Sequence, residues 1–141
     1  MIGGVQLMGK IVIGVIVGFI VWSIVWVGSE PTLAKFWPEY ASHSIDVEKA
    51  LTNGTAVETN SVIAIANLIR SFLTSMIAGY LAALVAGEFK RSTMILGIIL
   101  VAVGIAVEFM FWNVAPAWYH ILFVLFLLPM TILGGRMRRS E

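Results

Sequence analysis

The sequence predicts an all-α polytopic membrane protein, a bundle of four transmembrane helices that forms a single domain over residues 1–141. Apolar residues make up 60% of the chain and charged residues only 12%, whereas soluble domains average about 45–50% and about 25%. The apolar residues also form helix-length runs, and about 20 of them cross the ~30 Å hydrocarbon core of a bilayer. Four crossings use most of the chain and leave little sequence for a soluble catalytic domain.

The predicted helices lie at about residues 10–28, 61–87, 93–112 and 117–133, and a long outer loop occupies 29–60. Asn60 and Ser61 are suitable caps for the start of the second helix, and Gly87 suits its end. Pro116 favours the start of the fourth helix. The Gly134-Gly135 pair is expected to stop that helix.

The loop at 29–60 is the only sizeable polar segment, and it is acidic. It contains one apolar and aromatic set at helical spacing: Leu33, Phe36, Trp37 and Tyr40. This spacing predicts a short interfacial helix that starts at Pro31 and bends or ends at Pro38. A second short helix is expected around 44–51.

Charge and aromatic residues predict the orientation of the bundle. Six of the nine basic residues fall on one side of it: Lys10, Lys90, Arg91, Arg136, Arg138 and Arg139. The positive-inside rule then places both termini in the cytoplasm of a bacterial inner membrane, with the acidic loop outside. An interfacial aromatic belt is expected at the outer boundary, made of Trp22, Trp26, Trp112, Trp118, Tyr119 and His120.

Small residues predict where the helices pack. They recur four or seven positions apart on three of the predicted helices: Gly14 and Gly18; Ser75, Gly79 and Ala83; Gly97 and Gly104. In lipid, apolar burial gives no drive between helices, so small residues mark the faces where backbones approach closely. The second helix carries the broadest such face, and we expect it to make the most protein contacts.

An arginine, Arg70, lies inside the second hydrophobic run. A charge there costs roughly 2.5–3.5 kcal/mol on insertion scales and normally has a partner. At 1.5 Å per residue, Arg70 lies roughly 12 Å and Glu108 roughly 6 Å below the same boundary, which predicts an intramembrane polar pair across the helical hairpin. Supporting hydrogen bonds are expected from Asn67, Ser71 and Thr74. The pair is open to two interpretations: a structural salt bridge, or a site for an ion, a proton or an anionic ligand.

The sequence assigns no catalytic residue, no metal site and no cofactor. It contains no cysteine, which excludes disulfides and thiolate ligands. His120 has His43 as its only possible histidine partner, so an interfacial polar anchor is expected rather than a metal ligand. The net charge of +1 is split between the two sides of the membrane and gives no basic patch for nucleic acid.

Three motifs carry a resemblance to the small four-helix membrane proteins of bacterial inner membranes. They are the Ala78-Gly79, Ala82-Ala83 and Ala86-Gly87 pairs, the W-x-x-x-P-x-W-Y segment at 112–119, and the L-P…L-G-G-R segment at 128–136. The resemblance implies a four-helix membrane fold and no particular activity.

The sequence therefore leads to a non-enzymatic membrane protein whose partners are the lipid bilayer and other membrane helices. We expect an accessory or scaffold subunit of a larger complex, or a homo-oligomer. The alternative is a small transporter or channel that uses the Arg70 and Glu108 site. A third interpretation is lipid or quinone contact at the outer aromatic belt.

Overall fold

The computed structural model describes residues 2–57 and 60–139, and over these residues the chain is entirely helical apart from short connections. The described part contains five α-helices and one 3₁₀ turn: α1 (Ile2–Phe36), α2 (Pro38–Asn53), α3 (Ser61–Ala86), α4 (Lys90–Met110), η1 (Trp112–Val114) and α5 (Ala117–Arg139). Helices α1, α3, α4 and α5 are long and apolar enough to cross a membrane. The predicted all-α fold with four membrane-spanning helices is confirmed at this level. Residues 58 and 59 of the predicted loop lie outside the described residues.

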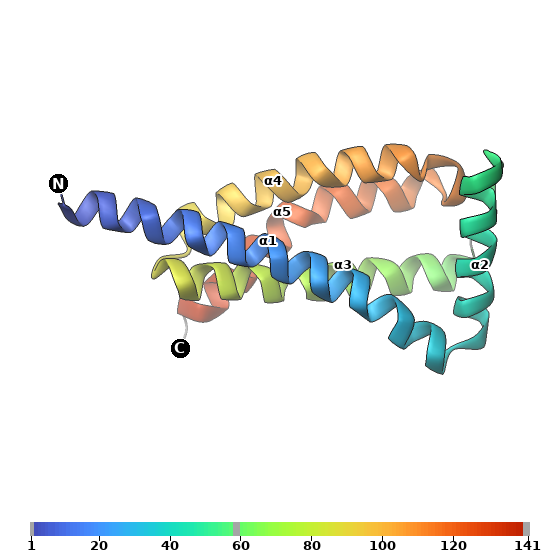
Figure 1. Cartoon of the computed structure of the whole chain (residues 1–141), viewed down its shortest axis with the longest axis horizontal. Helices are drawn as coiled ribbons and strands as arrows, with labels where there is room; N and C mark the ends of the chain where they lie inside the picture. Colours follow the sequence, from blue (N-terminus) through green and yellow to red (C-terminus); the bar gives the residue numbers. More distant parts are fainter. Residues whose placement is uncertain (1, 58–59, 140–141) are drawn as a thin grey trace.

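The four long helices run up and down in one bundle, with both ends of the chain at the same end (Figure 1). Helix α1 crosses the bundle obliquely, and its last turns diverge from α4 and α5. Helix α2 runs across the opposite end, close to η1. The loop after α2 is tied to η1, because the Val57 amide donates to the Asn113 carbonyl oxygen (3.1 Å). The end of the bundle is therefore covered by a helix rather than left open.

The first helix is longer than predicted, because it continues through Pro31 to Phe36. The hydroxyls of Ser29 and Thr32, which flank this proline, donate to the backbone carbonyls of Trp26 (3.1 Å) and Gly28 (3.4 Å). Ser and Thr hydrogen bonds of this kind accompany prolines that are tolerated in membrane helices. The prediction that a helix starts at Pro31 is wrong. The break falls at Trp37, whose extended backbone is the conformation favoured before a proline.

The last helix also runs further than predicted, through Gly134 and Gly135 to Arg139. A glycine ends a helix by adopting a left-handed conformation, and among the described glycines only Gly54 and Gly87 have a positive φ. Gly134 and Gly135 instead allow close packing between helices. A Cβ at Gly134 would overlap the Met76 backbone of α3, and one at Gly135 would overlap the Thr93 side chain of α4.

Helix α3 packs against both α1 and α5 through its small residues. Gly14 and Gly18 of α1 lie on the ridge formed by Ala78, Ala82 and Ala86, which are fully buried. On a neighbouring ridge, Gly79 lies directly against the Thr131 backbone of α5. The indole N–H of Trp22 donates to the Ser75 hydroxyl (3.0 Å) beside these contacts. The small-residue face is thus occupied by helices of the same chain.

Helix α4 uses its glycines in the same way. Gly97 faces Leu128 of α5, and Gly104 faces Leu127. The turn from α3 into α4 is short, because Gly87 ends α3 in a left-handed conformation and Glu88 caps α4. The Glu88 carboxylate accepts hydrogen bonds from the amides of Arg91 (2.9 Å) and Ser92 (2.6 Å). This short turn makes α3 and α4 antiparallel, and α5 packs against both of them (Figure 1).

We predict that Gly79→Ala lowers the free energy of unfolding in detergent by about 1–3 kcal/mol, because its Cβ overpacks the α3–α5 contact. Gly9→Ala is the matched control. Its Cβ meets nothing within 4 Å, so this change is expected to be neutral or to stabilise α1 by up to about 1 kcal/mol. Denaturant titrations of both variants measure the difference. Equal stability of the two variants would contradict the packing.

Candidate functional site

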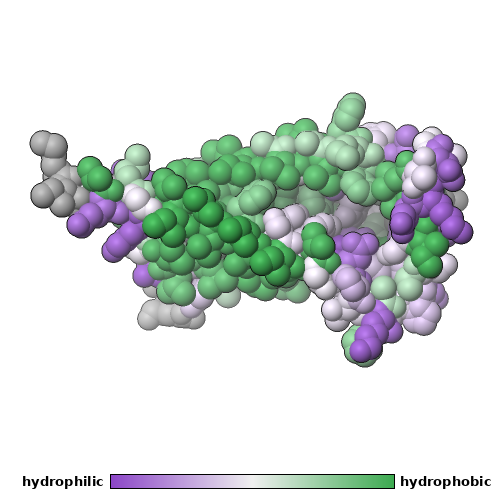
Figure 2. Space-filling view, viewed as in Figure 1, coloured by the Kyte–Doolittle hydropathy of each residue, from purple (hydrophilic) through white to green (hydrophobic). Residues whose placement is uncertain are grey.

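A cavity of about 170 Å³ lies at the α2 end of the bundle. By comparison, an engineered apolar cavity of about 150 Å³ holds benzene. Residues of all five helices line this cavity, and the ones that carry its chemistry are Trp26, Glu30, Tyr40, Arg70, Glu108 and His120. Figure 2 shows polar residues gathered where the bundle meets α2, beside a largely apolar bundle surface. We call this cavity the α2 pocket.

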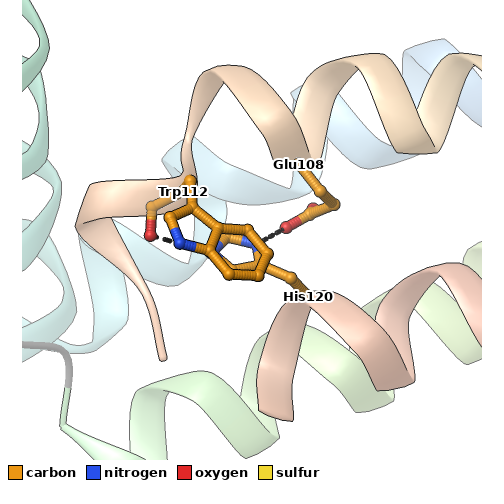
Figure 3. Close-up of polar contacts among 3 residues, drawn as sticks. All are labelled: Glu108, Trp112 and His120. Carbon is orange, nitrogen blue, oxygen red and sulfur yellow. Dashed lines mark hydrogen bonds and ion pairs between the residues drawn. The ribbon is translucent and has the colours of Figure 1, made fainter. Parts of the chain in front are cut away.

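Glu108 and His120 form an acid–base contact at one wall of the pocket. Nδ1 of His120 contacts Oε2 of Glu108, and Nε2 lies 3.2 Å from the Trp112 carbonyl oxygen (Figure 3). The Trp112 ring stacks on the imidazole, with the centroids 4.8 Å apart. Both side chains are buried. The contact therefore ties the end of α4 and the η1 turn to the first turns of α5.

The hydrogen-bond pattern makes this pair electrically neutral. A backbone carbonyl oxygen only accepts, so Nε2 of His120 carries a proton and donates it to Trp112. One further proton then lies between Nδ1 and Oε2. If it resides on nitrogen, a carboxylate faces an imidazolium; if it resides on oxygen, both groups are uncharged. In either case the Glu108–His120 pair contributes no net charge to the pocket.

Arg70 is held by neutral groups of α1. Its Nη1 donates to the Trp26 carbonyl oxygen (3.1 Å) and to the Ser29 hydroxyl (3.0 Å). The guanidinium carbon lies 3.9 Å from the centre of the Trp26 ring, a cation–π geometry. Its Nε is buried without a hydrogen-bond acceptor among the described residues. Arg70 therefore brings to the pocket a positive charge that forms no ion pair with a carboxylate among the described residues.

The predicted direct pair between Arg70 and Glu108 is not formed, although both residues line the α2 pocket. In the part of the chain that the structure describes, the one ion pair is between Glu108 and His120. The rotation of α3 turns Arg70 toward Trp26 of α1, while the tight turn after α4 returns His120 to Glu108. The feature of the sequence that could have indicated this pair is His120, a third ionisable group 12 positions after Glu108.

None of the three predicted supporting residues accepts a hydrogen bond from the guanidinium in the structure. Asn67 lines the pocket and accepts a hydrogen bond from the Tyr40 hydroxyl (3.0 Å), which links α2 to α3. Thr74 donates to the backbone carbonyl of Arg70 (2.6 Å), within its own helix. Ser71 is fully buried. Of the three, only Asn67 shapes the pocket.

The predicted aromatic belt is divided by the structure. Trp22 and Trp26 stack on each other (5.4 Å) and meet the edge of Phe123 inside the bundle. Tyr119 and His120 are also buried, so His120 is not an interfacial anchor. Only Trp112 and Trp118 are exposed. The physical reason is that Trp22, Trp26 and Tyr119 pack around Phe123, whereas His120 is held by Glu108 and Trp112.

Two groups of α2 that line the pocket have shifted pKa values. Burial raises the pKa of Tyr40 above its ordinary value, against the opposing effect of Arg70. Its hydroxyl therefore stays protonated and donates to Asn67. Burial lowers the pKa of His43 below its ordinary value, with Asp46 acting in the opposite direction. Both shifts reflect the packing of α2 onto the bundle.

Among residues 2–57 and 60–139, no three histidine or acidic side chains come together to hold a metal ion. In comparisons with protein-family models, with curated proteins and with solved structures, nothing matches this chain.

We predict strong energetic coupling between Glu108 and His120 and weak coupling between Arg70 and Glu108. In double-mutant cycles of Gln substitutions, the first pair should couple by about 1 kcal/mol, within the range of membrane hydrogen bonds. The second pair should couple by less than about 0.5 kcal/mol, because its members share no direct contact. Unfolding in detergent provides the free energies. Stronger coupling of the Arg70 and Glu108 pair would restore the sequence-based pairing.

We predict that α2 becomes less firmly docked as the pH falls below about 6.5, the ordinary pKa of histidine. The folded state binds a proton at His43 less readily than the unfolded state, so protonation favours undocking. Hydrogen exchange of α2 amides, corrected for intrinsic rates, measures the effect. His43→Gln should reduce this pH dependence, and an unchanged profile would show that His43 is not its source.

Proposed function

We propose that this chain is a non-enzymatic multi-pass membrane protein that binds a small anionic solute at Arg70, as the binding step of a small transporter or channel. One observation supports this function above others. The charge of Arg70 has only neutral contacts among the described residues, while that of Glu108 is cancelled by His120. A bound oxyanion would supply the missing countercharge.

The donors of Arg70 favour an oxyanion as the bound group. A guanidinium binds carboxylate through two parallel N–H···O bonds, which are stronger than bonds between neutral groups. Nη1 already has two acceptors, whereas Nε has none. The Trp26 ring holds the guanidinium plane in place. The arginine is thus oriented before a ligand arrives, which lowers the entropic cost of binding.

The size and charge of the α2 pocket favour a small monocarboxylate over phosphate. A cavity of about 170 Å³ accepts a molecule close to benzene in size. Glu30 also lines the pocket, and its exposed carboxylate bonds to the Ser44 hydroxyl (3.5 Å). This second negative charge would repel a dianion more strongly than a monoanion.

We propose that the α2 pocket opens to the outside of a bacterial inner membrane. The predicted cytoplasmic termini share one end of the bundle, and α2 lies across the other (Figure 1). The basic residues flank the first end, which the positive-inside rule assigns to the cytoplasm. Helix α2 then lies at the outer interface, where it covers the pocket.

A second proposed function is that of an accessory or scaffold subunit. Its support comes from the start of α1, which extends beyond the bundle (Figure 1) and exposes Val5 and Met8. A partner helix would cover these side chains. Gentle extraction and native mass spectrometry should then yield a larger complex, whereas a solitary chain would count against this role.

We predict that sodium propionate raises the thermal unfolding midpoint of the purified protein and that Arg70→Gln abolishes the rise. At ten times the dissociation constant, a ligand adds about 1.4 kcal/mol of stability. Phosphate should stabilise less, because of Glu30. Lys90→Gln is the matched control, since it removes an exposed cation at the other end of the bundle. An equal propionate effect in wild type and Arg70→Gln would refute the Arg70 site.

A further inference from the structure

The end of the bundle opposite α2 carries a cluster of basic side chains. The cluster comprises Lys10 on α1, Lys90 and Arg91 at the start of α4, and Arg136 and Arg138 at the end of α5. All of them are exposed or half-buried. Figure 2 shows hydrophilic residues gathered at this end, directly beside the apolar surface of the bundle. We call this cluster the basic end.

Helix packing brings the cations of α4 and α5 together. A Cβ at Gly135 of α5 would lie 3.3 Å from the Cβ of Phe89 and would overlap the Thr93 side chain of α4. Gly135 directly precedes Arg136, and Phe89 directly precedes Lys90. The basic residues of the two helices therefore flank one close helix contact.

Lys10 is level with the same contact. Gly14 of α1 packs on Ala86 of α3, whereas Gly18, one turn later, packs on Ala78. Helix α1 therefore runs antiparallel to α3. Lys10 lies about one turn before Gly14, so it is level with the turn that follows Ala86 and leads into α4. Three helices thus contribute positive charge at one level of the bundle.

Among the described residues, Glu88 is the only acid at the basic end. Its Oε2 accepts a hydrogen bond from the Arg91 amide (2.9 Å), and its Oε1 accepts one from the Ser92 amide (2.6 Å). The other described acids lie on α2, at the end of α1 or at the end of α4: Glu30, Glu39, Asp46, Glu48 and Glu108. The described part of the basic end therefore has an excess of positive charge.

Exposed apolar side chains lie about one turn further into the bundle. They are Met94 and Ile95 on α4 and Leu133 on α5. Because α4 and α5 are long and apolar enough to cross a membrane, these side chains would meet acyl chains. Lysine and arginine near the end of such a helix reach the headgroup level. A charged zone next to an apolar zone matches the two parts of a phospholipid.

We propose that the basic end binds an anionic phospholipid. Its phosphate lies between the start of α4 and the end of α5, and its acyl chains lie along Met94 and Leu133. Arginine binds phosphate through paired N–H donors, and lysine acts as a point charge. A zwitterionic lipid is a poorer ligand, because its own ammonium group is repelled by the cluster. The site shares no residue with the α2 pocket, so it is independent of monocarboxylate binding.

Quenching of a single fluorophore tests this site. The chain contains no cysteine, so Met94→Cys accepts one bimane label beside the basic end. The labelled protein is placed in phosphatidylcholine vesicles that contain phosphatidylglycerol with a nitroxide on its acyl chain. The comparator is phosphatidylcholine with the same nitroxide. We expect phosphatidylglycerol to bind about fivefold more tightly or better, since one basic residue near a membrane surface contributes about this factor.

Salt and matched charge variants test the origin of the preference. In 1 M NaCl the Debye length is about 3 Å, so the two lipids should quench almost equally. Lys90→Gln with Arg91→Gln should remove most of the preference. Lys35→Gln with Lys49→Gln makes the same change in charge toward α2 and should leave the preference unchanged. A bimane on Ile121→Cys, exposed near the start of α5, should be quenched equally by both lipids.

Three results would overturn the proposal. The first is equal quenching of the Met94→Cys label by the two lipids at low salt. The second is a preference that persists when Lys90 and Arg91 are both replaced, or that is equally strong at Ile121→Cys. The third is full competition by soluble glycerol 3-phosphate, which would identify a site for a dissolved anion. The salt series uses the unaltered basic residues, so it decides the electrostatic origin even if a charge variant does not fold.

Discussion

The contact between Glu108 and His120 is the interaction on which the rest of the site depends. In this contact His120 of the same chain balances the acidic charge of Glu108, so the buried pair carries no net charge. It also joins the end of α4 to the start of α5 through the Trp112 carbonyl. Because Glu108 is paired with His120, the hydrogen-bond partners of Arg70 among the described residues are neutral. The α2 pocket is therefore lined by several polar and charged side chains, whereas the cavity between α4 and α5 is largely apolar, and the Glu108–His120 pair lies between them.

Close packing elsewhere makes room for this arrangement. Gly14 of α1 and Gly79 of α3 bring backbones together near one end of the bundle. Helix α1 crosses obliquely from that contact, so its last turns diverge (Figure 1), and the α2 pocket lies at that end of the bundle. Trp26 occupies part of that space and supplies both a carbonyl oxygen and a ring to Arg70. Small residues at one end thus permit a polar pocket at the other.

Much of the fold was predictable from the sequence, because hydrophobic length is a local property. The four spans and most of their boundaries follow from it, and the small-residue ridges lie at helix contacts. The partners of Arg70 and Glu108 were not predictable, because partners depend on how each helix rotates about its axis. Depth alone placed both residues at one pocket without fixing that rotation. The helix end predicted at Gly134 and the helix start predicted at Pro31 were wrong for a related reason. Whether such residues interrupt a helix depends on the neighbouring backbone and side-chain hydroxyls.

The partner of Glu108 is the most direct test of this account. Solid-state NMR on protein labelled with ¹⁵N-histidine, ¹⁵N-arginine and ¹³Cδ-glutamate would measure nitrogen-to-carboxyl dipolar couplings, with Glu108→Gln as reference. We expect a strong histidine-to-glutamate coupling that disappears in the variant, and no arginine coupling that changes with it. An arginine-to-glutamate coupling that is lost in Glu108→Gln, with the histidine signal unaffected, would contradict the assignment and return Arg70 to a structural salt bridge.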